Sequence, residues 1–344
     1  MSHPIFKAEP FFHSENVLAE GILWDSKTQL LHWVDIETAS LYTLDIETKE
    51  WSIDKYPESQ FLTSIALRKD EPGLVATNRH SMVILPTPTP VSSSPSVVER
   101  KSLQILCTPL RKDVHDLVGF NDGACDPQGR YLAGSMNKMA KNDQVRRGEL
   151  IRYSPDGTVE RLLENIGLSN GIGFSLDHKT MYYIDSQDPT VDTFSYPSTG
   201  LPTDRKQFIQ PPPPSSPPKR AIFDGMCLDG IGNLWVARWN HGRIIGYTPE
   251  GKIICEIHTI GSKSPTICCF GGKNLDKMFI VSAHTSRITP DPVPEGEKEV
   301  SKEDLQKMYP HSGDVMMVDF AIGTEIRKVL GEGWKGAERY RFAG

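Results

Sequence analysis

The chain has 344 residues, with 38 Lys and Arg against 44 Asp and Glu, and its formal net charge is −6. No basic run is dense enough to follow a nucleic-acid backbone, and no apolar run approaches the roughly 18 residues of a membrane span, so neither nucleic acid nor membrane is expected as a partner. Residues 1–12 carry Lys7 and Glu9 within a short apolar stretch, which argues against a signal peptide and predicts a cytoplasmic protein.

Short apolar runs rich in Val, Ile, Tyr and Trp follow one another along the chain, each bracketed by turn residues, which predicts strands. Clear examples are Leu30–Val34, Met181–Ile184 and Asn233–Ala237. Hairpin turns are expected where glycine can supply a positive φ, at Gln128-Gly129, Asp156-Gly157 and Glu250-Gly251. One short helix is expected at Lys302–Met308, and Ile5–Glu9 is expected to complete the sheet that contains Val315–Val318.

A repeated frame relates several of these strands. Four segments begin with a side chain that offers oxygen, namely Glu20, Asn121, Asn170 and Asp224, and carry Asp or Ser five residues later, before a turn and another strand. Two weaker copies contain Ser64 and Thr266. The copies are spaced by roughly 40 to 55 residues, which is the range of propeller blades.

These repeats predict an all-β protein, a six-bladed β-propeller with a central metal site, which forms a single domain over residues 1–344. Proline-rich stretches near 86–97 and 211–218 cannot extend a hydrogen-bonded ladder. We expect them to be surface insertions that fall between blades.

The first strand of a propeller blade faces the central channel, so equivalent positions of successive blades meet at one axis. Glu20, Asn170 and Asp224 would then bring together two carboxylates and one amide oxygen. These hard ligands suit one divalent cation among Ca²⁺, Mg²⁺, Mn²⁺ and Zn²⁺, with Ca²⁺ favoured and open positions left for catalysis. The alternative is that they bind backbone groups and ordered waters that fill the channel.

Several motifs occur in one order along the chain: Asn121-Asp122-Gly123, Ser169-Asn170-Gly171, Asp224-Gly225-Met226-Cys227 and residues 268–274. With these motifs the chain resembles the senescence marker protein/regucalcin/gluconolactonase family, from Ala19-Glu20 to the terminal Phe342-Ala343-Gly344. The resemblance implies a six-bladed propeller that binds one divalent cation and opens sugar lactones.

The resemblance also implies roles for individual residues. Glu20, Asn170 and Asp224 match the metal ligands of the family, and Asp224 also matches its general base. Asn121 matches a residue that contacts the substrate near the metal. The metal would polarise the lactone carbonyl, while Asp224 accepts a proton from the attacking water.

Two departures from the family pattern concern the substrate. Gly119 stands where sugar lactonases have Arg, and Lys138-Met139 follows a stretch after which regucalcin-like members have Glu. Losing these polar groups predicts a substrate less polar than a sugar lactone. Large side chains that could line the pocket are Met139, Trp24, Trp239 and His284.

Other functions remain open from the sequence. The same scaffold could serve a metal-dependent esterase or phosphotriesterase, or a calcium-binding protein without catalysis. For an enzyme, the expected partner is a small lactone or ester, and we expect a monomer or weak oligomer. Residues 167–171 fit the G-x-S-x-G pattern of a serine hydrolase, but a strand is expected to follow where that pattern needs a helix. The six cysteines lack C-x-x-C spacing, which predicts reduced thiols.

Overall fold

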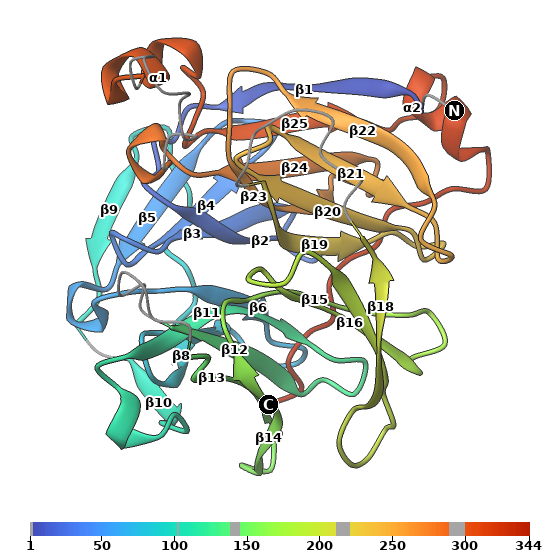
Figure 1. The fold of residues 1–344 in the computed structure, drawn as a ribbon. Coiled ribbons are helices and arrows are strands. Elements are labelled where there is room, and N and C mark those ends of the chain that lie inside the picture. The colour runs from blue at the N-terminus through green and yellow to red at the C-terminus, as the bar shows by residue number, and fades with distance from the viewer. Residues whose placement is uncertain (1–2, 102, 138–144, 211–220, 289–299) are drawn as a thin grey trace.

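The structure is a computed structural model that describes residues 3–101, 103–137, 145–210, 221–288 and 300–344. The strands form an eight-stranded sheet, three four-stranded sheets and a five-stranded sheet, arranged as the blades of a propeller-like fold (Figure 1). The eight-stranded sheet consists of two four-stranded halves joined at β1 (Ile5–Phe12), so the sheets supply six blades. The predicted all-β class is therefore confirmed.

The first three blades run from the N-terminal part of the chain. Blade 1 contains β2 (Ala19–Asp25), β3 (Leu30–Asp35), β4 (Ser40–Asp45) and β5 (Trp51–Lys55), with β9 (Ser96–Glu99) added at its edge. Blade 2 contains β6 (Ser64–Leu67), β7 (Leu74–Thr77), β8 (Met82–Leu85) and β10 (Gln104–Cys107). Blade 3 contains β11 (Val118–Cys125), β12 (Tyr131–Asn137), β13 (Gly148–Tyr153) and β14 (Val159–Ile166).

The remaining blades follow in chain order. Blade 4 contains β15 (Ser169–Phe174), β16 (Thr180–Asp185), β17 (Val191–Ser195) and β18 (Thr203–Ile209). Blade 5 contains β19 (Ile222–Leu228), β20 (Leu234–Trp239), β21 (Arg243–Tyr247) and β22 (Ile253–Thr259). Blade 6 contains β23 (Pro265–Gly271), β24 (Lys277–Ser282), β25 (Val315–Asp319) and β1. Helical segments are α1 (Lys302–Met308), α2 (Glu325–Leu330) and single 3₁₀ turns at Pro57–Ser59, Lys112–Val114 and Thr285–Arg287.

The first strand of each blade belongs to a closed ring. These strands contact one another in the cyclic order β2, β6, β11, β15, β19, β23 and back to β2. They are the strands that carry the repeated frame, so the copies found in the sequence stand at equivalent places around one centre.

Apolar side chains fill the spaces between neighbouring blades, because successive residues of a strand point to opposite faces of its sheet. Ile22 packs with residues of blade 6, whereas the next residue, Leu23, packs with residues of blade 2. The adjacent Cys268 and Cys269 likewise belong to different clusters. All six cysteines are free, as the spacing predicted.

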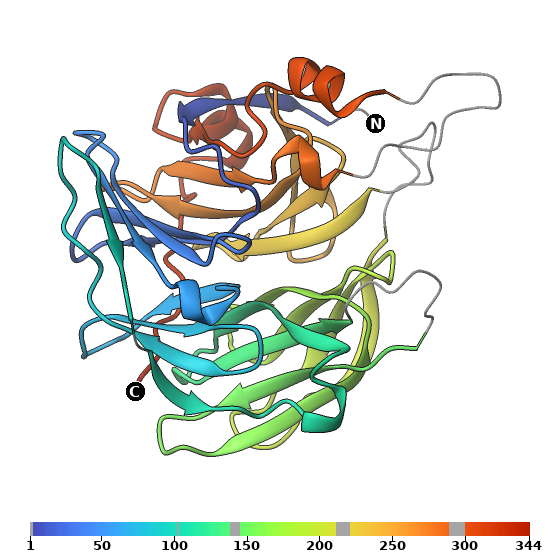
Figure 2. The same cartoon turned by 90° about the vertical axis from the view of Figure 1, so that its left-hand side faces the viewer.

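β1 closes the ring by joining two blades. It pairs in parallel with β22, from Ile5 opposite Glu256, and antiparallel with β25, from Glu9 opposite Met317. In Figures 1 and 2 it runs along the top of the molecule beside these strands. The prediction that Ile5–Glu9 completes the sheet of Val315–Val318 is confirmed only for Glu9, because Ile5–Ala8 pair with β22 of blade 5 and the contact with β25 continues to Phe12. The helix at Lys302–Met308 is confirmed.

The C-terminal residues cross the ends of several blades, visible as the red segment in the middle of Figure 1. Arg341 forms an ion pair with Asp25 at 2.7 Å, and the backbone of Phe342 bonds to Leu67 and Lys69 of blade 2. The Phe342 side chain is 2 % exposed and packs in the core between blades 2 and 3. The segment therefore ties blades that lie far apart in the chain.

The first proline-rich insertion corrects one prediction. Residues 86–95 lie inside blade 2, between β8 and β10, and not between blades. The following residues form β9, which pairs in parallel with β5, from Ser96 opposite Ser52, and so widens blade 1. The second stretch, 211–218, and Met139 lie outside the described residues.

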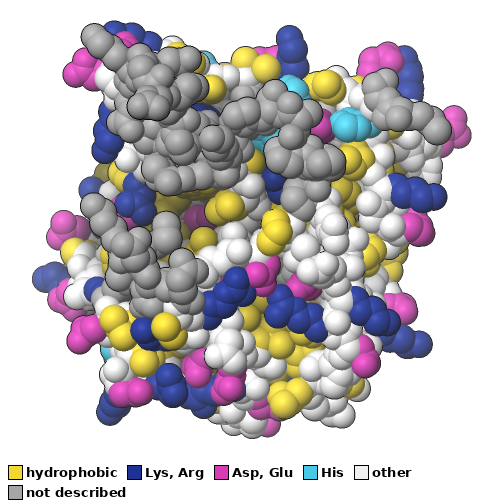
Figure 3. All heavy atoms as spheres, viewed as in Figure 1, with side chains coloured by type: hydrophobic (Ala, Val, Ile, Leu, Met, Phe, Trp, Pro, Cys, Tyr) yellow, Lys and Arg dark blue, Asp and Glu magenta, His cyan; other side chains and the backbone are white. Residues whose placement is uncertain are grey.

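Two surface features of the described residues complete the fold. None of their helices combines the length and apolar character that crossing a membrane would require. On the face shown in Figure 3, basic and acidic side chains are interspersed.

Candidate active site

The polar side chains of the repeated frame stand at irregularities of the innermost strands. Pairing with the second strand shifts register just after Glu20 in β2, around Asn121 in β11, around Asn170 in β15 and around Asp224 in β19. At such a bulge two residues of one strand lie opposite one residue of its partner. One side chain therefore no longer follows the alternation between the two faces of the sheet. Glu20, Asn170 and Asp224 are 6 %, 3 % and 4 % exposed, so all three are buried at these bulges.

Glycines next to these residues let the innermost strands approach closely. A Cβ atom at Gly171 would lie 2.9 Å from the carbonyl oxygen of Asp224, and one at Gly225 would lie 2.6 Å from Cβ of Ile267. Any larger residue at these two positions would therefore push β15, β19 and β23 apart. The close approach occurs where Asn170 and Asp224 stand.

The Asp residues five positions later have a different task. Asp126 accepts hydrogen bonds from the backbone N–H groups of Gln128 and Arg130, and Asp229 accepts from those of Ile231 and Asn233. They thereby hold the turns that follow the innermost strands. The second half of the repeated frame is thus structural.

Three buried carboxylates act on one another near the centre of the ring. Burial raises the pKa of Glu20 well above its ordinary value, and repulsion from Asp224 and Asp122 raises it further. Burial, followed by repulsion from Asp122, raises the pKa of Asp224 in the same way. Burial also raises the pKa of Asp122. The three carboxylates stand at bulges of the innermost strands and are 6 %, 4 % and 4 % exposed, so little water is available to screen their repulsion.

Arg339 of the C-terminal segment offsets part of this negative charge. Its guanidinium lowers the pKa of Glu20 and of Asp122, against the effect of burial. The same group donates to the carbonyl oxygens of Met226, at 2.9 Å, and Cys268, at 3.2 Å. The main chains of β19 and β23 therefore hold the charge in place.

This environment fits a divalent cation, because a cation would offset the remaining repulsion between buried carboxylates. Among the described residues, no group of three or more His, Cys, Asp or Glu side chains is placed to hold a metal ion. The amide oxygen of Asn170, buried at the equivalent bulge of blade 4, is a further candidate donor beside the carboxylates of Glu20 and Asp224. Such a set of oxygen donors suits Ca²⁺ or Mg²⁺.

Two amide side chains meet across blades 3 and 4. The Nδ2 group of Asn121 donates to Oδ1 of Asn170 at 2.9 Å and to the carbonyl oxygen of Ser169 at 2.8 Å. The Nδ2 group of Asn170 donates to Oγ of Ser186 at 2.7 Å. Both N–H groups of Asn121 are therefore engaged by protein, which leaves its Oδ1 as an acceptor for a hydroxyl of a substrate.

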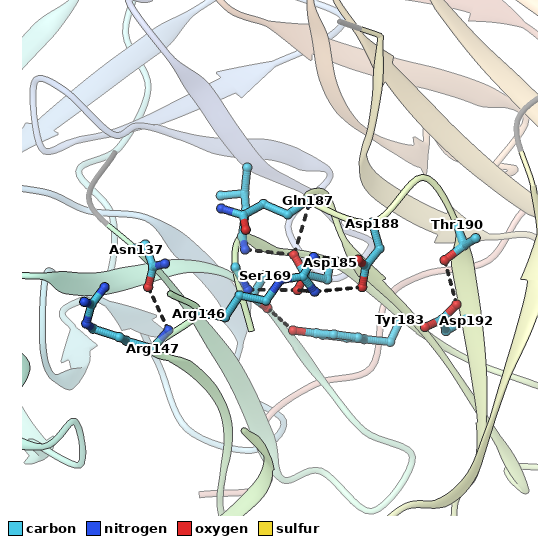
Figure 4. Close-up of polar contacts among 12 residues, drawn as sticks. Asn137, Arg146, Arg147, Ser169, Tyr183, Asp185, Gln187, Asp188, Thr190 and Asp192 are labelled. Atoms are coloured by element: carbon cyan, nitrogen blue, oxygen red, sulfur yellow. Dashed lines mark hydrogen bonds and ion pairs between the residues drawn. The ribbon is translucent and has the colours of Figure 1, made fainter. Parts of the chain in front are cut away.

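Asp185, the residue before Ser186, holds the start of β15 (Figure 4). Its carboxylate accepts from the backbone N–H groups of Gly167 and Leu168, both at 2.8 Å, and Arg146 approaches it at 3.4 Å. Asp35 makes the same contacts in blade 1, to the N–H groups of Val17 and Leu18. This shared device fixes the chain just before Asn170 and just before Glu20.

Ser64 and Thr266, the weaker copies of the frame, bind protein groups. The Ser64 hydroxyl pairs with Thr77 and Tyr131, and Thr266 donates to the carbonyl oxygen of Ala19 at 2.6 Å. Ser169, in the G-x-S-x-G pattern, begins strand β15 and accepts from the Tyr183 hydroxyl at 2.8 Å, as Figure 4 shows. The strand expected to follow it is confirmed, where a nucleophile elbow needs a helix.

The residues predicted to line a pocket divide between two ends of the ring. Trp239 ends β20 and pairs with Ile222, two residues before Asp224, while His284 follows β24 and its backbone N–H donates to Val17. Both therefore lie at the end where the innermost strands begin. Trp24, 3 % exposed, lies four residues beyond Glu20, packs in the core against Phe279 and borders a small cavity shared with Arg339.

Sequence reasoning missed Asp122, Ser186 and Arg339. Asp122 had a signal, since it precedes a glycine as Glu20 and Asp224 do. The carboxylates of Glu20 and Asp122 accept a hydrogen bond from the N–H of that glycine. The backbone of Gly225 likewise lowers the pKa of Asp224, against the effect of burial. Ser186 and Arg339 had none, because Ser186 follows β16 and Arg339 lies in the C-terminal segment, both outside the repeated frame.

Comparisons with known proteins agree with this architecture. Residues 18–284 match the family model described as the SMP-30/gluconolactonase/LRE-like region. Regucalcin from Xenopus laevis is 32 % identical over 331 residues, covering 95 % of each chain, and pentonolactonase XacC from Haloferax volcanii is 28 % identical over 267 residues, covering 77 % of this chain and 81 % of its own.

A solved structure supports the fold. The structure of a calcium-binding protein, regucalcin, from Agrobacterium tumefaciens superposes with a TM-score of 0.77 over 100 % of both chains, at 20 % identity. With the family model matching most of the chain, the predicted resemblance is confirmed: this chain belongs to the SMP-30/gluconolactonase/LRE-like family.

Proposed function

We propose that this protein hydrolyses a lactone with the help of one divalent cation, held by Glu20, Asn170 and Asp224. Among the cations that such oxygen donors bind, Ca²⁺ is the one we favour. The observation that carries the proposal is that Glu20, Asn170 and Asp224 are all buried at equivalent bulges of the innermost strands, which contact one another in a closed ring. The lactonase named among the relatives adds support for the reaction class.

In the proposed reaction, water adds to the carbonyl carbon, and the bond between that carbon and the ring oxygen breaks to give a hydroxy acid. A divalent cation, when bound, supplies a Lewis acid that withdraws electron density from the carbonyl oxygen. Asp224 would accept the proton that the water loses and return it to the departing ring oxygen. One carboxylate thus serves both directions of proton transfer.

Asn121 and the rim residues would orient the substrate. The Oδ1 of Asn121, for which the described residues supply no donor, can accept a hydrogen bond from a substrate hydroxyl, while the N–H groups of its amide are engaged. Trp239 and His284 lie at the same end of the ring and would border the lactone. Gly119, in the strand of Asn121, adds no side chain, so we propose a substrate less polar than a sugar lactone.

The test is to measure hydrolysis rates of Asp224→Asn and of the unaltered protein on aldonolactones and apolar lactones, with Ca²⁺, Mg²⁺ or Mn²⁺ added after chelation. Loss of a general base costs typically 10²- to 10⁴-fold in rate, so we expect a fall in kcat/KM of at least about a hundredfold. Asp177→Asn, at an exposed turn of blade 4, serves as the matched control and should keep full activity.

Equal rates for Asp224→Asn and the unaltered protein, or activity that survives chelation undiminished, would contradict the proposal. Turnover of carboxylic esters or phosphotriesters instead of lactones would keep the site and change the substrate.

A further inference from the structure

The hydroxyl of Ser186 can accept a hydrogen bond from Asn170 but cannot donate one to it. Ser186 is 6 % exposed, and its Oγ lies 2.5 Å from the carbonyl oxygen of Phe223, the residue before Asp224. A carbonyl oxygen only accepts, so the single proton of the hydroxyl is committed to Phe223. Towards Asn170, at 2.7 Å, Ser186 is therefore an acceptor.

This commitment fixes which end of the Asn170 amide faces which neighbour. Its Nδ2 must face Ser186, which leaves Oδ1 on the side of Asn121. A reversed amide would set its oxygen against the lone pairs of Ser186 and its N–H groups against those of Asn121. Asn121 reinforces the choice, because its N–H groups are already directed at Asn170 and at the carbonyl oxygen of Ser169.

The position of Ser186 is itself well determined. Its backbone N–H donates to the carbonyl oxygen of Leu168 at 2.8 Å, and the preceding Asp185 is held by the contacts in Figure 4. Through its hydroxyl, Ser186 thus links β15, which carries Asn170, with β19, which carries Asp224.

We propose that Ser186 is a positioning residue: it holds the amide of Asn170 so that oxygen, and not nitrogen, is available to the cation. This inference rests on the cation site of the proposed function. An amide nitrogen cannot ligate a hard cation, so each reversed amide removes one of the three proposed ligands. Residues that orient metal ligands in this way typically change metal affinity by 10- to 100-fold when they are replaced.

The test measures Ca²⁺ affinity by calorimetry, without substrate, in two backgrounds. In the first background Asn170 is retained, and Ser186→Ala is expected to weaken Ca²⁺ binding at least about tenfold. In the second background Asn170→Asp supplies an oxygen in either orientation, so adding Ser186→Ala is expected to change affinity by less than about twofold. Ser186→Cys keeps the volume with a weak donor and acceptor, and should show the same dependence on background.

Ser52→Ala is the control for the loss of a buried hydroxyl, since Ser52 is 1 % exposed and donates to the carbonyl oxygen of Thr89 far from the ring centre. We expect it to bind Ca²⁺ as the unaltered protein does. Three results would overturn the role of Ser186 while leaving the proposed cation site intact. They are unchanged Ca²⁺ affinity in Ser186→Ala, equal losses of affinity in both backgrounds, and an equal loss of affinity in Ser52→Ala. Absence of Ca²⁺ binding in the unaltered protein would overturn the proposed cation site as well.

Discussion

Asp122 shows how a single residue can shape a site that it is not proposed to ligate. It is 4 % exposed and raises the pKa of both Glu20 and Asp224. Its charge should therefore attract a cation to the ring centre, while it destabilises the cation-free protein through repulsion. The two effects have opposite signs and can be measured separately.

We expect Asp122→Asn to lower Ca²⁺ affinity by about fivefold, the order of one charge acting over several ångströms through a partly screened interior. The same variant should melt at a higher temperature than the unaltered protein once both are free of cation, because one repulsive charge is gone. Calorimetry and circular dichroism melts would measure the two quantities, with Asp177→Asn as the exposed control. Tighter Ca²⁺ binding in Asp122→Asn would contradict this interpretation.

Among the elements, the C-terminal segment, residues 334–342, stabilises the fold by packing against several blades and not by forming a strand of a sheet. We call this segment the clasp. Trp334 packs against Phe270 and Phe320 of blade 6, while Phe342 packs between blades 2 and 3. A segment of a few residues thus connects the last blade with early ones. Burial of a large aromatic ring is the main gain, since an exposed ring would contribute little.

Truncation of this clasp should be costly. Phe342→Ala removes a buried ring and leaves a cavity, so we expect it to lower the free energy of unfolding by about 3 to 5 kcal/mol in urea titrations. Ile322→Ala is the control, since Ile322 is 88 % exposed, and should change it by less than about 0.5 kcal/mol. If Phe342→Ala were as stable as Ile322→Ala, the segment would not act as a clasp.

Elements whose pattern is local could be predicted from the sequence, and elements that depend on distant partners could not. The glycine turns at Gly129, Gly157 and Gly251 have positive φ, as expected from their dipeptides. β9 was not predicted from the sequence. It follows a proline-rich stretch, and its pairing with β5 depends on a partner more than 40 residues earlier in the chain. α2 was missed as well, since six residues hold too little periodicity to recognise.

At the scale of the whole molecule, the repeat made the fold predictable. The copies of the repeated frame lie in innermost strands, four of them at the bulges of β2, β11, β15 and β19. These innermost strands contact one another in a closed ring. The same repeat made the candidate site only partly predictable. It named Glu20, Asn170 and Asp224, but Ser186 comes from the loop after β16 and Arg339 from the C-terminal segment, and no repeat encodes the approach of either.

Stability should depend on pH through the buried carboxylates. In the unfolded chain they titrate near about 4, whereas burial and repulsion raise the pKa of Glu20 and Asp224 well above that in the folded protein. As pH rises above about 4, the unfolded chain releases protons first, so the cation-free folded state loses stability until its own pKa values are passed.

Asp224→Asn removes one of these titrations. Without cation, its melting temperature should exceed that of the unaltered protein by more at pH 8 than at pH 5, and added Ca²⁺ should stabilise the unaltered protein more at pH 8. A difference that shrinks as pH rises would show that Asp224 is not a carboxyl with a raised pKa.

The most direct measurement is Ca²⁺ titration of the chelator-treated protein by calorimetry, comparing the unaltered protein with Glu20→Gln and Asp224→Asn. These two residues lie in different blades, and we propose that they ligate the same ion. We expect one Ca²⁺ per chain in the unaltered protein and an affinity lower by at least about a hundredfold in each variant, because each loses a charged ligand. Undiminished binding in both variants, or no binding by the unaltered protein, would contradict a cation held at the centre of the ring.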